Sequence, residues 1–359
     1  MRRTLFPRSA LGLAVCLLGG AAWAQNGGGR PEVDWVELAM GFLGGLVLFL
    51  FGVSQLAEGL REAAGERVKS LLGRATDGPV RGLLTGVVAT TLLDSSSVTI
   101  ILLIGLVDAG LMGFAQALPV ILGSNIGTTV SSQIFALGVD EYAPVMMLAG
   151  LLLRALSSRD DVKAGGTALL GVGLVLFGLH VLSDAVEPLR DHPVVLDWIK
   201  GMSTPLLGVL AGAAFTLLIQ SSSATLGVVI VMAGQGLIEL PTGLAIMLGA
   251  EIGTCSDTLV ATVGRSRHAV RAGVFHLLFN CVSVAIGVLL IDWLAAFARF
   301  TSGEVPNQIA NAHVAFNLVG AAVFLPFSAR IAALLARAIP DRGAPGGVGQ
   351  TEPVPRPAE

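Results

Sequence analysis

Long apolar segments dominate this sequence and constrain its fold more than any other feature. Each has about the length that enters or crosses a bilayer, for which a complete helical span needs about 20 residues. Only 13% of the 359 residues are charged, against roughly 25% in soluble proteins, so a soluble domain could not cover its surface. The sequence therefore predicts an all-α integral membrane protein. The nine apolar segments are 36–56, 82–107, 114–137, 143–156, 166–182, 205–233, 241–263, 272–291 and 308–327.

Two kinds of motif interrupt four of these segments near their middles. Segments 82–107 and 205–233 each contain three consecutive serines, and segments 114–137 and 241–263 each contain two glycines four residues apart. Non-helical backbone at membrane depth survives only when it is buried in protein or lines a wet cavity, and glycine lets the backbone bend. We therefore expect the serine segments to be re-entrant helical hairpins and the glycine segments to be broken transmembrane helices. The glycines at the expected breaks are Gly123, Gly127, Gly249 and Gly253.

The interruptions recur at a constant offset, which indicates an internal duplication. The second serine triplet and the second glycine motif each follow the first by 126 residues, and 94–132 shares 13 of its 39 residues with 220–258. We expect one repeat over 35–156, a second over 165–291, and a final span with an amphipathic end over 308–340. Each repeat contains three full crossings, an odd number, so the second copy is expected to be inverted relative to the first.

The charges in the loops predict the orientation through the positive-inside rule. The loop before the first hairpin is basic and the loop before the second is mainly acidic, so the hairpins are expected to enter from opposite sides. Seven full crossings plus two hairpins satisfy every loop, with the mature N-terminus outside and the C-terminus cytoplasmic. Residues 1–24 have the pattern of a signal peptide, with an uncleaved signal anchor as the alternative. Residues 341–359 are rich in Pro and Gly and are expected to form a disordered cytoplasmic tail.

Matched, hydroxyl-rich interruptions in inverted repeats indicate a secondary transporter that binds its substrate near the membrane midplane. Ser and Thr hydroxyls can donate to an oxyanion or offer lone pairs to sodium, and half-helix N-termini favour anions. The net charge of −3 gives no basic surface for nucleic acid, and the three cysteines lack the spacing of metal ligands. The candidate substrate- and ion-binding residues are Asp94, Ser95, Ser96, Ser97, Thr99, Ser124, Asn125, Thr128, Thr129, Gln220, Ser221, Ser222, Ser223, Thr225, Glu251, Thr254 and Ser256.

The most specific motifs are Gln-Ser-Ser-Ser at 220–223 and Gly-Ser-Asn-Ile-Gly-Thr at 123–128. They resemble the duplicated motifs of the type II-like sodium/phosphate cotransporter family, and this chain is similar to bacterial members without a PhoU-like domain. The resemblance implies a sodium-coupled symporter of inorganic phosphate that works by alternating access in the bacterial inner membrane. Sodium would bind at the same sites as the substrate. The resemblance implies no enzymatic activity, no other cofactor and no transition metal, and it suggests a homodimer.

Two acidic residues depart from the family motifs. Asp94 stands where the first motif should have Gln, and Glu251 stands where the second glycine motif should have Asn. A charge at the bilayer centre costs roughly 2.5–3.5 kcal/mol on insertion scales. Neutral drift is therefore an improbable origin of acidic residues at both places. We expect Asp94 and Glu251 to bind coupling cations or to take up protons. The alternative is that one or both face away from the site and pair with a backbone donor or an arginine.

Other interpretations of the same residues stay open. The chain could transport another small oxyanion, couple transport to protons, or act as a sensor that does not transport. An intramembrane serine hydrolase would use one triplet serine as nucleophile and His276 or His313 as base, although the sequence has no Gly-x-Ser-x-Gly motif. Each histidine precedes an asparagine, Asn280 or Asn317, by four residues. This spacing favours an interhelical hydrogen bond over a proton relay.

Overall fold

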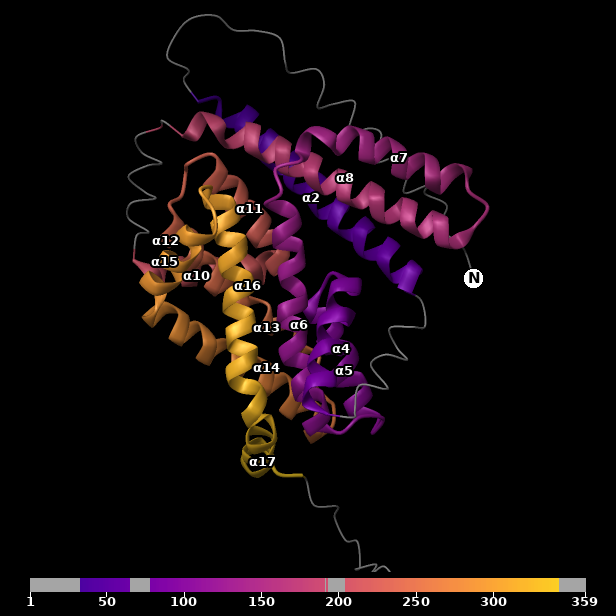
Figure 1. The fold of residues 1–359 in the computed structure, drawn as a ribbon, viewed down its shortest axis with the longest axis vertical. Coiled ribbons are helices and arrows are strands. Elements are labelled where there is room, and N and C mark those ends of the chain that lie inside the picture. The colour runs from indigo at the N-terminus through magenta and orange to yellow at the C-terminus, as the bar shows by residue number, and fades with distance from the viewer. Residues whose placement is uncertain (1–32, 65–77, 191, 193–203, 342–359) are drawn as a thin grey trace, which may run out of the picture.

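The computed structural model describes residues 33–64, 78–190, 192 and 204–341. The expected signal peptide, most of the expected tail and the basic residues of 65–77 lie outside these ranges. Every element in the described part of the chain is helical, which confirms the all-α prediction (Figure 1). The α-helices are α2 (Trp35–Ala64), α4 (Pro79–Leu93), α5 (Ser96–Asp108), α6 (Phe114–Phe135), α7 (Ala143–Leu156), α8 (Asp160–Val186), α10 (Pro205–Ile219), α11 (Ser222–Gly234), α12 (Leu240–Gly253), α13 (Cys255–Val260), α14 (Arg267–Leu289), α15 (Ile291–Thr301), α16 (Val305–Phe324) and α17 (Ser328–Ala338).

Several helices have the length and composition of membrane spans. Among the described residues, five helices are long and apolar enough to cross a membrane, or six if the bent pair α6 and α7 counts as one span. That pair bends by 79° at the short turn around Asp140. Helix α7 has 14 residues and is therefore about 21 Å long, shorter than the hydrocarbon core. The expected seven crossings and their orientation stay predictions.

Both serine segments form two short helices joined at the serine triplet. The first copy contains α4 and α5, and the second contains α10 and α11. Each helix of the second pair begins and ends 126 residues after its counterpart in the first. Two residues separate the helices of each pair, and the first of them is left-handed, Asp94 with φ 50° and Gln220 with φ 60°. The four helices are apolar but too short to cross a bilayer alone, which is the form expected of hairpins.

The prediction that 114–137 is a broken helix is wrong, because α6 runs continuously through Gly123 and Gly127. In the second copy α12 also continues to Gly253, and the only interruption before α13 is Thr254, whose backbone stays helical. These glycines permit close packing instead. A Cβ atom at Gly123 would lie 1.9 Å from the Leu83 carbonyl oxygen of α4. Each hairpin therefore packs its first helix directly against α6 or α12.

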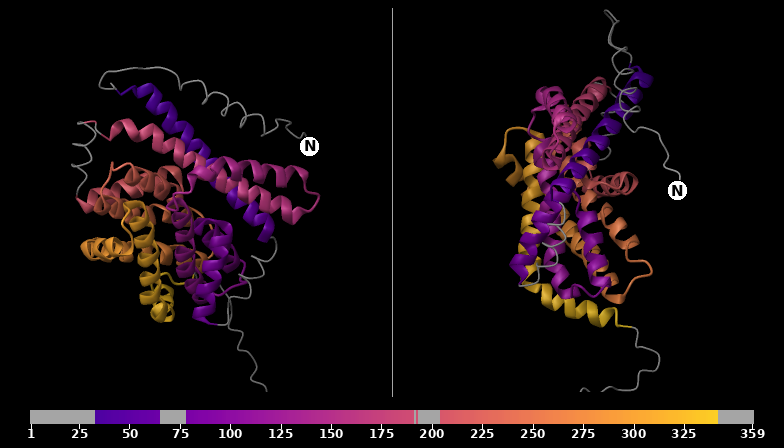
Figure 2. Two further views of the ribbon diagram at one scale, coloured as in Figure 1. Left: turned by 45° about the horizontal axis from the view of Figure 1, so that its top comes forward. Right: turned by 90° about the vertical axis from the view of Figure 1, so that its right-hand side faces the viewer.

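Helices α2, α7 and α8 pack together beside the bundle that contains the hairpins (Figures 1 and 2). Glycines again bring backbones into contact, since a Cβ atom at Gly59 of α2 would lie 2.3 Å from the Ala168 nitrogen of α8. Small residues at helix contacts are typical of membrane proteins. The rings of Phe49 on α2 and Phe135 on α6 meet edge to face at 5.3 Å. They belong to the apolar cluster that joins α2 and α8 to the hairpin bundle.

The C-terminal part contains two amphipathic helices. Helix α17 lies at the end of the range 308–340, where it follows α16 and turns away from it (Figure 2). Most of the stretch between the apolar segments 272–291 and 308–327 forms a further helix, α15. Its aromatic side chains Trp293, Phe297 and Phe300 are exposed. A helix of 11 residues is too short to be recognised as a span, which is why hydropathy alone missed it.

Candidate functional site

The two serine triplets meet at one small cavity, although they are 126 residues apart in the chain. The cavity has a volume of about 30 Å³ and lies where the tips of both hairpins approach α6 and the end of α12. All of its lining residues are among the predicted site residues. The lining consists of Asp94, Ser95, Ser96, Ser97, Thr128, Gln220, Ser221, Ser222, Ser223 and Thr254.

The tip of the first hairpin is fixed by local hydrogen bonds. Asp94 ends α4 in the left-handed conformation, which costs a residue other than glycine roughly 1–2 kcal/mol. Ser95 then caps α5 by accepting a hydrogen bond from the Val98 amide at 3.2 Å. The Thr90 hydroxyl donates to Thr99 Oγ1 at 2.8 Å and ties the two helices of the hairpin together. Helix α5 consequently begins at the cavity, where its first amides have no intrahelical acceptor.

The second hairpin repeats this arrangement residue for residue. Gln220 has the left-handed backbone, and Ser221 accepts a hydrogen bond from the Ala224 amide at 3.1 Å. The hydroxyls of Thr216 and Thr225 lie 2.6 Å apart. Two helix N-termini, those of α5 and α11, are therefore directed at the same cavity, and together they favour negative charge there.

The Asp94 carboxylate is only half satisfied. Ser131 of α6, which the sequence analysis did not select, donates a hydrogen bond to Asp94 Oδ1. Asp94 Oδ2 is buried and has no hydrogen-bond partner. Nearby, Ser97 of the first hairpin and Thr254 at the end of α12 share a hydrogen bond of 3.1 Å across the two copies. An unpartnered carboxylate oxygen among hydroxyls is a suitable donor set for a hard cation such as sodium.

The family description "Na+/Pi-cotransporter" matches residues 48–184 and 195–325. The chain belongs to this family. It is 30% identical to the Bacillus subtilis protein YqeW over 79% of this chain and 92% of that protein. No solved structure matches the chain.

Other relatives of the family carry names that describe phosphate transport. The chain is 26% identical to YjbB of Escherichia coli, named as a candidate inorganic phosphate export protein, over 79% of this chain and 53% of YjbB. It thus spans about half the length of that relative. A shorter match, 35% identical, links 28% of this chain to 16% of the rat sodium-dependent phosphate transport protein 2A. Membership of a transporter family supports phosphate transport and fits a protein that is not an enzyme.

The remaining predicted site residues do not line the cavity. Thr99 and Thr225 hold the hairpins together, as described above. Several hydroxyl and amide side chains bond to carbonyl oxygens three or four residues earlier in the chain, as isolated polar residues in membrane helices often do. Asn125, for example, donates to the Ile121 carbonyl at 3.0 Å, and Ser256 donates to the Gly253 carbonyl at 3.0 Å. The residues in this group are Ser124, Asn125, Thr129 and Ser256.

Glu251, the second departure from the family motif, lies away from the cavity in a buried polar network. Its Oε1 is 2.8 Å from His313 Nε2 and accepts a hydrogen bond from Asn317 Nδ2 at 3.0 Å. His313 Nδ1 is 2.9 Å from the Ser132 hydroxyl of α6. The interhelical hydrogen bonds expected for the His and Asn pairs are confirmed for His313 and Asn317 of α16. Glu251 is therefore paired with a histidine and an asparagine rather than with an arginine.

The same geometry disfavours the hydrolase interpretation. His276 Nδ1 bonds to the Thr258 hydroxyl at 2.9 Å, so both histidines bond to hydroxyls other than those of the serine triplets. Ser132 and His313 are 1% and 0% exposed. A substrate could not reach such a serine in this conformation.

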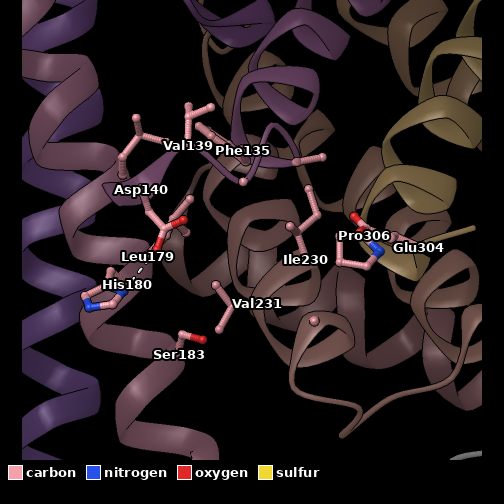
Figure 3. A pocket seen from close by; sticks show the side chains of 14 residues that line it. Phe135, Val139, Asp140, Leu179, His180, Ser183, Ile230, Val231, Glu304 and Pro306 are labelled. Carbon is pink, nitrogen blue, oxygen red and sulfur yellow. Dashed lines mark hydrogen bonds and ion pairs between the residues drawn. The ribbon is translucent and has the colours of Figure 1, made fainter. Parts of the chain in front are cut away.

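A second, larger hollow of about 190 Å³ lies between the α6–α7 turn, α8, α11 and the start of α16 (Figure 3). His180 Nδ1 lies 3.0 Å from Asp140 Oδ2, within hydrogen-bond distance, and Ser183 lies on the same helix as His180 (Figure 3). None of the predicted site residues lines it.

Proposed function

We propose that this chain is a sodium-coupled symporter of inorganic phosphate and that both ions bind at the cavity between the hairpin tips. The observation that carries the proposal is the convergence of both serine triplets on one cavity that contains the unpartnered Asp94 Oδ2. Family membership supports the substrate. The name of the rat relative supports sodium dependence, whereas the name of YjbB describes export.

The cavity offers complementary groups for the two ions. Serine hydroxyls and the first amides of α5 and α11 can donate hydrogen bonds to phosphate oxygens. Asp94 Oδ2, the Gln220 side-chain oxygen and hydroxyl lone pairs can coordinate sodium. A carboxylate beside the phosphate would repel it, and this repulsion is strong where water is scarce. Sodium bound at Asp94 removes the repulsion, so phosphate binding is expected to require sodium, which is the physical basis of coupling.

The cavity between the hairpin tips is small, with a volume of about 30 Å³. We expect the tips to separate as phosphate enters or leaves, which breaks the Ser97–Thr254 hydrogen bond. We expect the hairpins, α6 and α12 to move relative to α2, α7 and α8 during alternating access. We place the protein in the bacterial inner membrane with its C-terminus in the cytoplasm.

Flux measurements with purified protein in proteoliposomes test this proposal. We expect labelled phosphate to accumulate when sodium is higher on the side where phosphate is added, and not when potassium replaces sodium. Ser96→Ala and Ser222→Ala should each abolish most of this flux, because both hairpins contribute to one site. Ser54→Ala is the control and should retain it, because Ser54 is exposed on α2 and its hydroxyl donates to the Phe51 carbonyl of its own helix. Absence of sodium-dependent flux in the wild-type protein refutes the proposal, and competition by unlabelled sulfate or arsenate tests the choice of oxyanion.

A further inference from the structure

Two buried titratable side chains form a pair away from the cavity. Glu251 of α12 and His313 of α16 approach to 2.8 Å between Oε1 and Nε2, and their side chains are 6% and 0% exposed. They do not line the cavity to which we assign phosphate and sodium. At the matched position of the first copy stands Asn125, whose amide cannot take up a proton.

The hydrogen bonds around His313 determine where protons lie. The Ser132 hydroxyl has one proton, which it donates to the Thr129 carbonyl oxygen at 2.8 Å. Its 2.9 Å contact with His313 Nδ1 therefore requires Nδ1 to carry the proton and donate it. In a neutral imidazole with Nδ1 protonated, Nε2 is an acceptor, and an ionised carboxylate is an acceptor only. A further proton must then lie between Nε2 and Glu251 Oε1, on one atom or the other.

The surrounding charges lead to the same conclusion. Helices α6, α10 and α11 carry no charged side chain, and the charged residues of α15, Asp292 and Arg299, are exposed. The other titratable groups of the adjoining helices include Cys255, whose thiol donates to the Glu251 carbonyl, and Asp257 of α13, and His276 and Cys281 of α14. Arg271 of α14 bonds instead to the Ile339 carbonyl and to Asp341. With one shared proton the pair is neutral overall. Without it, a negative charge would be buried with no cation among the described residues bonded to it, which is strongly unfavourable.

We propose that the Glu251–His313 pair is a proton-binding site and that its proton is taken up and released during the transport cycle. This inference rests on the proposed transport function and adds the proton as a second coupling ion. The chain of contacts from Ser132 through His313 to Glu251 joins α6 of the first copy, α16, and α12 of the second. The first hairpin packs on α6 and the second on α12, so the expected separation of the hairpin tips moves α6 relative to α12 and breaks this chain. The break changes the stability of the protonated pair, so that movement and proton release are linked.

Glu251→Gln is the variant that tests the site. A glutamine amide can donate to His313 Nε2 in place of the shared proton, but it does not titrate. Phosphate accumulation is measured in proteoliposomes with equal sodium on both sides and an imposed pH difference. One pH unit is a tenfold proton ratio, so cotransport of one proton per phosphate changes wild-type accumulation by up to about tenfold. The Glu251→Gln variant should show only the change that follows from phosphate's own protonation, which is the same for both proteins.

His276→Gln is the matched control, because His276 is the equivalent histidine of α14 and should leave the pH response unchanged. An equal pH response in wild type and Glu251→Gln overturns the proposal, as does its loss in His276→Gln alone. Absence of phosphate flux in wild type under any gradient refutes the transport function instead. Nitrogen-15 NMR of histidine-labelled protein then tests the proton site on its own, with His313 assigned through His313→Gln. Protonated Nδ1 together with a hydrogen-bonded proton at Nε2 supports the site, and an unprotonated Nδ1 overturns it.

Discussion

Gly123→Ala is the substitution that best separates the two roles available to the glycines of α6. If the glycine serves to break the helix, alanine should stiffen and stabilise α6 by roughly 0.5–1 kcal/mol. In the structure, however, α6 is continuous and the added Cβ atom would lie 1.9 Å from the Leu83 carbonyl oxygen. The helices must separate by more than 1 Å to restore an ordinary contact. Overpacking of this kind typically costs about 1–3 kcal/mol, so we expect Gly123→Ala to lower the free energy of unfolding.

Thermal unfolding of purified protein in detergent measures this effect, with Gly44→Ala and Gly165→Ala as controls. Both control glycines lie inside helices, and a Cβ atom there would meet nothing within 4 Å. The controls should unfold at the wild-type temperature or slightly above it. Gly123→Ala should unfold several degrees lower and should also lose phosphate flux, because α4 carries the first hairpin tip. A Gly123→Ala protein as stable as the controls would refute the close-packing argument.

Three further predictions concern the hairpins and their ends. Thr216→Val removes the bond to Thr225 and should cost about 0.5–1.5 kcal/mol in the free energy of unfolding, measured by thermal unfolding; no loss would mean that this bond does not hold the hairpin. Asp94→Asn should weaken the sodium dependence of phosphate flux, and an unchanged sodium titration would exclude Asp94 as a ligand. The backbone hydrogen bond from Ser266 lowers the pKa of Asp108. Asp108 therefore stabilises the fold above the ordinary pKa near 3.8, and this contribution is lost as pH falls through the lowered value. Asp108→Asn should reduce the fall of the free energy of unfolding over this pH range. The same dependence on pH in the variant and the wild type would contradict the prediction.

The sequence could predict the hairpin tips because their signal is local. Three serines inside an apolar segment favour capping over helix continuation, and the same pattern after 126 residues excludes coincidence. The glycine motifs were ambiguous for a physical reason, since a missing Cβ atom permits either a bend or a close contact. Which of the two occurs depends on the helix opposite, and the Leu83 carbonyl that fills the space at Gly123 is 40 residues away. No local pattern contains that information.

The partners of Glu251 could not be predicted from the sequence either, because His313 is 62 residues distant in the chain. A signal was nevertheless present in the two His and Asn pairs, which the proposed site left without a role.

Asp94 and Glu251 are both carboxylates in place of amides, yet their surroundings favour different cations. Asp94 lies at a helix break with one oxygen unpartnered beside hydroxyls, where a hard metal ion can complete its coordination. Glu251 lies inside α12 with histidine and asparagine on the same oxygen, and this enclosed geometry fits a proton far better than a sodium ion, which needs several oxygen ligands. The two effects should therefore be separable. We expect Asp94→Asn to change the sodium dependence of phosphate flux and to keep its response to pH. We expect Glu251→Gln to keep the sodium dependence and to change the response to pH. If either variant changed both dependences equally, the two carboxylates would have to serve a single cation site.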